Sequence, residues 1–209
     1  MKDTADPSTL RQFREFARLT GLPVDHLLDA KHAEIMRTLD AVERLPAAAT
    51  PNILEMCAHG AMRPGLGVAF AEWINLRRLG PLSLLWDHCG TLSEAMRVSQ
   101  RYLHLESAAV GLDILDESNG EVALVHNLQV KTAMGGSQFL EATLASSVRV
   151  ARLIMGESWV PLRIEFAHSA GEGERVHRKF FRSPLQYRSD RYAIICSSED
   201  FTRRCSSGN

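Results

Sequence analysis

The chain has 209 residues, 45% of them apolar and 23% charged, so it can bury a sizeable hydrophobic core. Its formal net charge of −1 argues against a surface devoted to nucleic-acid binding. Its four cysteines include no C-x-x-C pair, which argues against a disulfide framework, and no apolar run resembles a signal peptide or a membrane span. We therefore expect a soluble cytoplasmic protein.

The first third of the chain is predicted to be mostly helical. Residues 1–7 are polar and expected to be disordered. Ser8 can cap a helix over residues 9–19, which Gly21 ends. Further helical patterns cover three segments, with a proline-bounded break at residues 46–51. These segments are residues 24–45, 52–61 and 68–76.

A short apolar helix within residues 79–90 is expected to end at Gly90. A capping box follows, because the Thr91 hydroxyl can accept from the backbone N–H of Glu94 while the glutamate side chain reaches back. The helix that begins there carries apolar side chains at spacings of three, four and seven. They are Leu92, Ala95, Met96, Tyr102 and Leu103.

After His104 the apolar period changes from helical to two. Alternation over residues 108–115 and 121–128 predicts two strands, joined by a hairpin turn at Asn119-Gly120, where positive φ angles are tolerated. A long helix is then expected from Ser137 to about Met155.

The last quarter predicts a strand around residues 162–168, a helix over 172–181, and strands at 185–187 and 192–196. Helices and hairpin-linked strands are segregated along the chain rather than alternating. The expected fold class is therefore α+β, with a helical N-terminal part followed by a mainly antiparallel sheet packed with helices.

No motif in the sequence indicates catalysis or metal binding. The pairs Cys57/His59 and His88/Cys89 lack the spacing that places two donors on one metal. There is no G-x-S-x-G elbow, and the glycine pairs lack the rest of a phosphate or dinucleotide loop. We expect no catalytic residue, no metal site and no cofactor.

Two histidines, His126 and His168, fall on the apolar side of predicted strands. Each could be a core histidine bonded to backbone or tyrosine, or a polar anchor in an apolar effector pocket. Four aromatic residues present the same choice between core and pocket. The candidate ligand-binding residues are therefore Trp73, Trp86, Tyr102, His126, Phe139 and His168.

Three blocks of sequence, in order, resemble one protein family. The first joins Leu79-Gly80-Pro81-Leu82 to Thr91-Leu92-Ser93-Glu94-Ala95-Met96 and Tyr102. The second is the strand segment WVPLRIEFAH, from Trp159 to His168. The third is FFRSPLQY, from Phe180 to Tyr187, with the strand that ends at Cys196. Together they resemble the N-terminal effector-sensing domain, of the arabinose-binding type, of AraC family transcription regulators.

The resemblance implies that residues 8–201 form a ligand-sensing and dimerisation domain. It implies an unknown small-molecule effector, a homodimer, and contact with promoter DNA only through a C-terminal helix-turn-helix domain that this chain does not contain. Residues 202–209 would then be a tail or the start of a linker. A stand-alone small-molecule-binding protein, an enzyme with a cryptic site, and a dimerisation module that binds no ligand are the alternatives.

Overall fold

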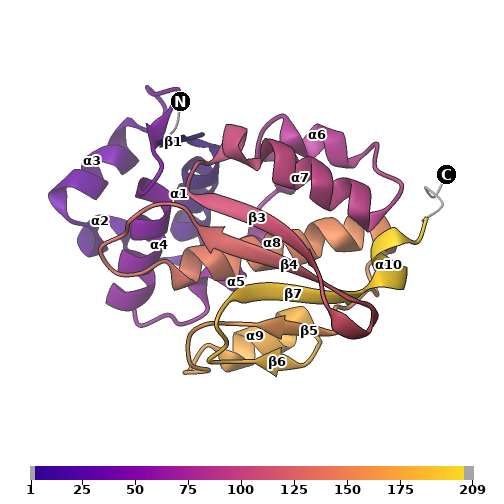
Figure 1. The fold of residues 1–209 in the computed structure, drawn as a ribbon. Coiled ribbons are helices and arrows are strands. Elements are labelled where there is room, and N and C mark those ends of the chain that lie inside the picture. Colours follow the sequence, from indigo (N-terminus) through magenta and orange to yellow (C-terminus); the bar gives the residue numbers. More distant parts are fainter. Residues whose placement is uncertain (1–2, 205–209) are drawn as a thin grey trace.

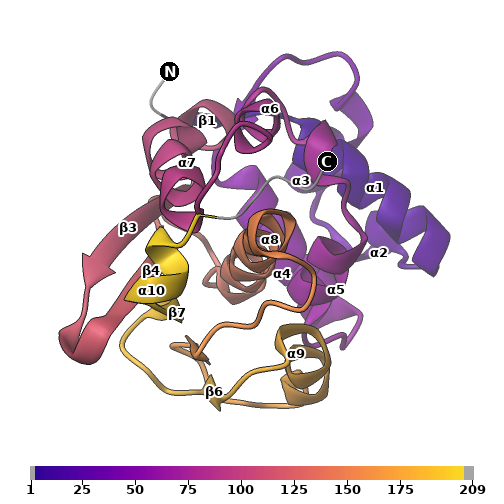
Figure 2. The ribbon, with the colours of Figure 1, turned by 90° about the vertical axis from the view of Figure 1, so that its right-hand side faces the viewer.

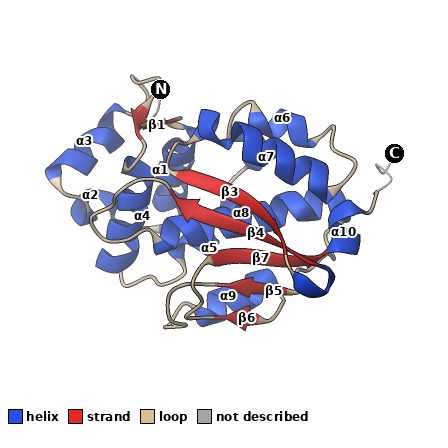
Figure 3. Ribbon diagram, viewed as in Figure 1, coloured by secondary structure: helices blue, strands red, loops and turns tan. Residues whose placement is uncertain are grey.

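The computed structural model describes residues 3–204, and the predicted α+β class is confirmed. A five-stranded sheet carries its helices on one face, and the N-terminal third forms a helical part beside it (Figures 1 and 3). The helices of the N-terminal part are α1 (Ser8–Thr20), α2 (Val24–Leu27), α3 (Ala30–Thr38), α4 (Ala49–Gly60) and α5 (Leu66–Trp73), followed by the 3₁₀ turn η1 (Leu76–Arg78).

The N-terminal segment is more ordered than expected for residues 1–7. Strand β1 (Thr4–Ala5) pairs with β2 (Leu45–Pro46), and Ala5 is buried. Met1 and Lys2 lie outside the described residues. A two-residue strand is too short to show any periodicity in the sequence, so backbone pairing with a distant segment is what fixes it.

Two details of the predicted helices are wrong. Ser8 does not cap α1, because its hydroxyl donates to the Leu79 carbonyl and Pro7 occupies the N-cap position. The helical pattern over residues 24–45 is divided between α2 and α3. The division follows from Asp29, whose carboxylate accepts from the backbone N–H of His32 and so starts a new helix.

The capping box at Thr91 is present in a shifted form. Thr91 Oγ1 accepts from the Glu94 backbone N–H at 3.0 Å, while Glu94 Oε2 accepts from the backbone N–H of Gly90 at 2.6 Å. This cap begins α7 (Leu92–Glu106), which follows the short α6 (Leu82–Trp86).

The sheet has the strand order β3-β4-β7-β5-β6, and every pairing except β5–β6 is antiparallel. Asn119 and Gly120 both take positive φ in the turn η2 (Ser118–Gly120), so the predicted hairpin is confirmed. The strands are β3 (Val110–Asp116), β4 (Glu121–Leu128), β5 (Arg163–Glu165), β6 (Leu185–Gln186) and β7 (Tyr192–Ser197).

Helix α8 (Ser137–Met155) lies between the sheet and the N-terminal helices, and its predicted bounds are confirmed. It packs against β4 and β7 on one side and against α4 and α5 on the other (Figure 2). Leu144 and Val148 of α8 are fully buried in the core that these elements share. The remaining helices are α9 (Glu174–Phe181) and α10 (Ser198–Thr202).

No helix of the described residues covers the opposite face of the sheet (Figure 2). That face carries a chain of ion pairs. Arg163 pairs with Glu121 and Glu165, and Arg191 pairs with Glu165 and Glu117. Four small or branched apolar side chains lie buried on this face: Ala123, Val125, Ala193 and Ile195. Within residues 3–204, no helix is long and apolar enough to cross a membrane.

Candidate functional site

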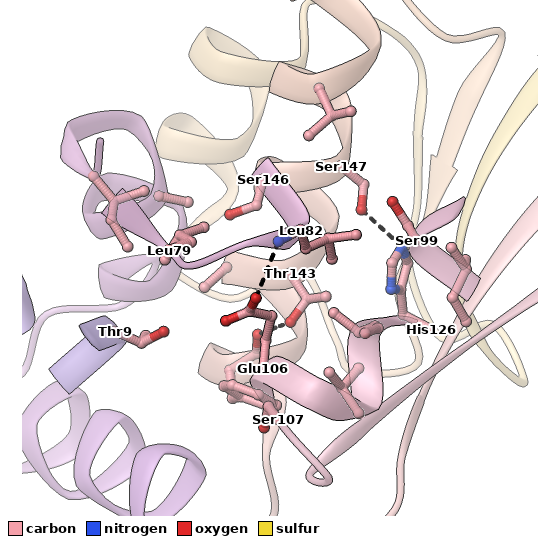
Figure 4. Close-up of a pocket in the computed structure, with 18 of the residues that line it drawn as sticks. Thr9, Leu79, Leu82, Ser99, Glu106, Ser107, His126, Thr143, Ser146 and Ser147 are labelled. Atoms are coloured by element: carbon pink, nitrogen blue, oxygen red, sulfur yellow. Dashed lines mark hydrogen bonds between the residues drawn. The ribbon is translucent and has the colours of Figure 1, made fainter. Parts of the chain in front are cut away.

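A cavity of about 130 Å³ lies where the helical part meets the sheet. Helices α5, α6, α7 and α8 and strands β3 and β4 all contribute to its wall (Figure 4). Most of the lining is apolar, including Phe70, Ile74, Leu82, Met96 and Val110. This combination of apolar wall and a few polar groups is typical of small-molecule sites.

His126 is the buried polar group at the sheet side of the cavity. It is only 2% exposed, and its ring points from β4 into the cavity toward Ser147 of α8 (Figure 4). Its Nε2 lies 3.1 Å from Ser147 Oγ, whereas its Nδ1 is buried without any hydrogen-bond partner in the described part of the chain. A buried polar atom without a partner is uncommon and costly, so Nδ1 is a natural point of attachment for a ligand.

Burial lowers the pKa of His126 to about 4. The ring is therefore neutral at physiological pH, with one nitrogen protonated and the other free to accept. Whether Ser147 donates to Nε2 or accepts from it decides which role Nδ1 takes. In both cases Nδ1 is an uncharged hydrogen-bonding group without a partner among residues 3–204.

A second polar group, Glu106, lies at the helical side of the cavity. Its Oε1 accepts from the Leu82 backbone N–H at 3.2 Å, and burial raises the pKa of its carboxyl. The carboxylate fits closely against Gly80, where an added Cβ would lie 2.2 Å from Glu106 Oε2. Gly80 has a φ of +123°, and this backbone conformation favours glycine at the position, whereas the Glu106 carboxylate is the end of a flexible side chain that can shift.

Trp86 forms part of the wall through a fixed contact. Its indole Nε1 donates to Ser99 Oγ at 2.9 Å, and that hydroxyl donates in turn to the Ala95 carbonyl at 2.8 Å. The hydrogen bond thus joins the indole to α7 and satisfies its one polar atom. Only its apolar surface is left for a ligand.

The structure separates the six candidate residues into two groups. Trp86, His126 and Phe139 line the cavity together, whereas Trp73, Tyr102 and His168 do not. Trp73 is 37% exposed and packs against Phe16 with ring centroids 5.8 Å apart. Tyr102 is half-buried on α7, with the Arg101 guanidinium 5.4 Å from its ring.

His168 belongs to a different polar cluster, on the far side of α8. The carboxylate of Glu141 lies between two imidazoles, with His168 Nε2 at 3.0 Å and His177 Nε2 at 3.1 Å. Tyr187 Oη is 2.9 Å from His177 Nδ1 and completes the cluster. Among residues 3–204, no three His, Cys, Asp or Glu side chains are placed to hold a metal ion.

The Glu141 cluster perturbs the titration of its members. Burial alone would raise the pKa of Glu141, but the bonds from His168 and His177 lower it below its usual value. Burial alone would lower the pKa of His168, but its bonds to the Glu141 carboxylate and to the Ser169 carbonyl raise it. The carboxylate is therefore ionised, and the pair stabilises a positive His168.

No sequence pattern pointed to the polar side chains that line the cavity beside His126. Ser99, Glu106 and Ser147 look like solvent-facing positions of amphipathic helices when each helix is read alone. Glu106 is the last residue of α7, and Ser147 is one of four hydroxyl residues on α8. Their arrangement around His126 follows from the packing of helices on the sheet.

Comparison with known proteins assigns the chain to a family. Residues 21–205 match the family described as "Arabinose-binding domain of AraC transcription regulator, N-term". No curated protein matches the sequence.

One solved structure, the transcriptional regulator CdpR from Pseudomonas aeruginosa, shares the fold with a TM-score of 0.58 at 17% identity, over 70% of this chain and 48% of CdpR. The chain thus spans about half the length of that regulator. With most of its length matched by one family, the chain belongs to the N-terminal arabinose-binding domain family of AraC transcription regulators.

Proposed function

We propose that this domain is the effector-sensing part of a cytoplasmic AraC-type regulator, and that its effector binds in the cavity beside His126. The observation that carries the proposal is that His126 lines an apolar cavity and that its buried Nδ1 has no hydrogen-bond partner among the described residues. A ligand that satisfies this atom gains a hydrogen bond in a site of low dielectric.

The size and lining of the cavity favour a small, mainly apolar effector with one hydrogen-bonding group. An engineered apolar cavity of about 150 Å³ binds benzene, so a volume of about 130 Å³ suits a single small ring or a short branched chain. The hydrogen-bonding group of the ligand would face His126, and its apolar body would lie against Trp86 and Phe139.

A sugar fits this lining poorly, although the family description names arabinose. A pentose has several hydroxyl groups, each of which loses water on binding and needs a protein partner. The cavity wall is mostly apolar, and the Trp86 indole nitrogen is already bonded to Ser99. The effector of this chain is therefore proposed to be less polar than a sugar.

We infer a non-enzymatic role for the site, even though Ser147 and His126 lie in contact as a nucleophile and a base do. In a catalytic pair, a third group orients the histidine through its other ring nitrogen. Here that nitrogen, Nδ1, has no partner in the described residues. With a pKa of about 4, His126 is also a weak base at neutral pH.

Control of promoter DNA would follow from a shift between two arrangements of the regulator. An effector changes DNA binding only through different affinities for the two arrangements. The cavity wall combines α6 and α7 with α8 and the sheet, so a ligand there acts on the packing between these parts. Dimerisation and the DNA-binding helix-turn-helix domain are proposed from the family alone.

The ligand proposal is tested with a pair of small molecules that differ in one polar group, phenol and toluene. Isothermal titration should show that His126→Phe weakens phenol binding about five- to tenfold, the value of one hydrogen bond, and leaves toluene binding nearly unchanged. Trp73→Ala, at a residue outside the cavity, should alter neither affinity. Tighter binding of arabinose than of phenol would contradict the proposal.

Dimerisation and DNA control need separate experiments. Sedimentation equilibrium over a wide range of concentration should show a reversible dimer. In a longer form that carries a helix-turn-helix domain, a cavity ligand should change promoter affinity by about fivefold or more. If no cavity ligand changes the affinity of the regulator for its promoter, the sensing role is refuted.

A further inference from the structure

A second hollow, a cleft of about 400 Å³, lies on the side of α8 away from the effector cavity. It is bounded by α5, the C-terminal half of α8 and the end of α9, which lie together in Figure 2. Four cationic side chains line it, against two carboxylates, those of Glu72 and Glu157. The four cations are Arg149, Arg152, Lys179 and Arg182. The volume of the cleft is in the range of small-molecule sites.

Two of these cations are held in place by backbone carbonyls. Arg149 Nη1 donates to the Ala71 and Ile74 carbonyls at 2.6 and 2.5 Å, at the C-terminus of α5. Arg152 is buried and donates to the Trp159, Phe180 and Phe181 carbonyls, the last two at the C-terminus of α9. The guanidinium groups are thereby oriented before any ligand arrives.

Each of these guanidiniums keeps an unused donor nitrogen. In the described part of the chain, Arg149 Nη2 and Arg152 Nη1 make no hydrogen bond. Both residues line the cleft. A guanidinium presents five N–H donors, and a bound oxyanion is the acceptor that suits them.

The cleft also differs from the rest of the protein in its ion pairing. Arg163 and Arg191 each pair with two carboxylates within 3 Å. Arg149, Arg152 and Lys179 form no ion pair within residues 3–204, and the nearest carboxylate oxygen to Arg182 is that of Glu157 at 3.9 Å. The four cations of the cleft thus outnumber its two carboxylates, and of the four only Arg182 has a carboxylate oxygen within 4 Å among the described residues.

Burial and charge act against each other on the two inner arginines. Burial lowers the pKa of Arg149, and burial together with the neighbouring Arg182 lowers the pKa of Arg152, while Glu157 and Glu72 offset part of both shifts. The C-termini of α5 and α9 supply about half a negative charge each, which offsets only part of the excess. An anion in the cleft would relieve the repulsion that remains.

We propose that this cleft binds a small molecule carrying oxyanion groups, either phosphates or several carboxylates, as a second ligand site of the domain. Arg149 and Arg152 would contact the oxyanion from the floor of the cleft, and Lys179 and Arg182 from its rim. The site is separate from the effector cavity, so the inference does not depend on the function proposed for that cavity.

The test is isothermal titration of the 209-residue protein with sodium pyrophosphate and, separately, sodium citrate, with ionic strength held constant by sodium chloride. Binding of one or both above the chloride background is expected. Pyrophosphate alone would assign a phosphate-bearing ligand, and citrate alone a polycarboxylate. No binding of either anion would overturn the proposal.

The decisive variant is Lys179→Ala/Arg182→Gly, since both side chains are exposed and Arg182 has a φ of +57° that glycine adopts freely. Losing two charged contacts should weaken binding about tenfold or more. The matched control is Lys131→Ala/Arg175→Ala, which removes the same charge outside the cleft and should change affinity less than threefold.

Equal weakening in both double variants would overturn the proposal, because it would show a general charge effect. Circular dichroism checks that the cleft variant folds. If it does not fold, Lys179→Ala alone decides the matter, because this exposed side chain has no ion-pair partner among the described residues. Its removal should weaken binding about threefold or more, and an unchanged affinity would overturn the proposal.

Discussion

The carboxylate of Glu55 caps α8 across a sequence distance of 83 residues: its Oε1 accepts from the backbone N–H of Gln138 at 2.7 Å. The same oxygen accepts from Ser137 Oγ at 2.9 Å. The N-cap residue of α8 is Gly136, which has no side chain to do this. A residue of α4 therefore supplies the cap and ties the helical part to the central helix.

Removing this cap should destabilise the domain. Glu55→Ala leaves the Gln138 backbone N–H and the Ser137 hydroxyl without their acceptor. We therefore expect the free energy of unfolding to fall by about 1–2 kcal/mol. Urea denaturation measures the change. Glu43→Ala, at an exposed carboxylate, should stay within about 0.5 kcal/mol, and equal losses in both variants would contradict the capping role.

Gly67 allows α5 and α8 to pack closely, so a larger residue at this position should strongly destabilise the fold. A Cβ at this position would lie 1.9 Å from the Gln138 carbonyl oxygen, which belongs to backbone and cannot move aside. We expect Gly67→Ala to cost about 3 kcal/mol or to prevent folding.

Gly60→Ala on α4 is the matched control for Gly67→Ala. Its Cβ would meet Leu27 Cδ2 at 2.8 Å, the far end of a flexible side chain. Its effect on thermal denaturation should be within about 1 kcal/mol of wild type. A Gly67→Ala protein as stable as Gly60→Ala would contradict the close packing of α5 and α8.

The Glu141 cluster should make stability depend on pH on the alkaline side. The raised pKa of His168 means that its stabilising contribution is fully present below pH 6.5 and is lost as pH rises through the elevated folded value. Below pH 6.5, Glu141→Gln should lower the free energy of unfolding by about 3 kcal/mol, since the buried ion pair loses its anion. In mildly alkaline buffer the decrease should be smaller. Urea denaturation under the two conditions measures the difference, with the exposed Glu172→Gln as control.

His126 should make the domain acid-sensitive. Its folded pKa of about 4 lies below the unfolded value near 6.5, so the unfolded chain takes up a proton first as pH falls. As pH falls from about 6.5 to about 4, the free energy of unfolding should decrease by about 3 kcal/mol relative to pH 7. His126→Gln should abolish this part of the acid dependence. An NMR titration that places the His126 pKa near 6.5 would contradict the prediction.

The local elements were largely predictable because each rests on short-range physics. The apolar stripe of α8 and the glycine after it set its bounds, and Asn119-Gly120 set the hairpin. The failures have a common origin in contacts between distant segments. Strand β1 depends on pairing with β2, and the break between α2 and α3 depends on one aspartate side chain.

The site was only partly predictable for a related reason. Period-two alternation placed His126 and His168 on the apolar side of their strands, but alternation does not say which helix covers each ring. In the structure α8 offers Ser147 to one histidine and Glu141 to the other. The charged cleft escaped detection entirely, because its cations come from α8 and α9 and are only brought together by packing.

Helix α8 forms part of the wall of both hollows, so the two proposed ligands would be thermodynamically coupled through it. Ser147 and Val150 line the apolar cavity, while Arg149 and Arg152, on another side of the same helix, line the charged cleft. A helix moves as a nearly rigid rod. A shift of α8 that accommodates a ligand in one site therefore also moves the α8 side chains that line the other site. Any such coupling must be reciprocal: the factor by which the anion changes the affinity of the apolar ligand equals the factor by which that ligand changes the affinity of the anion.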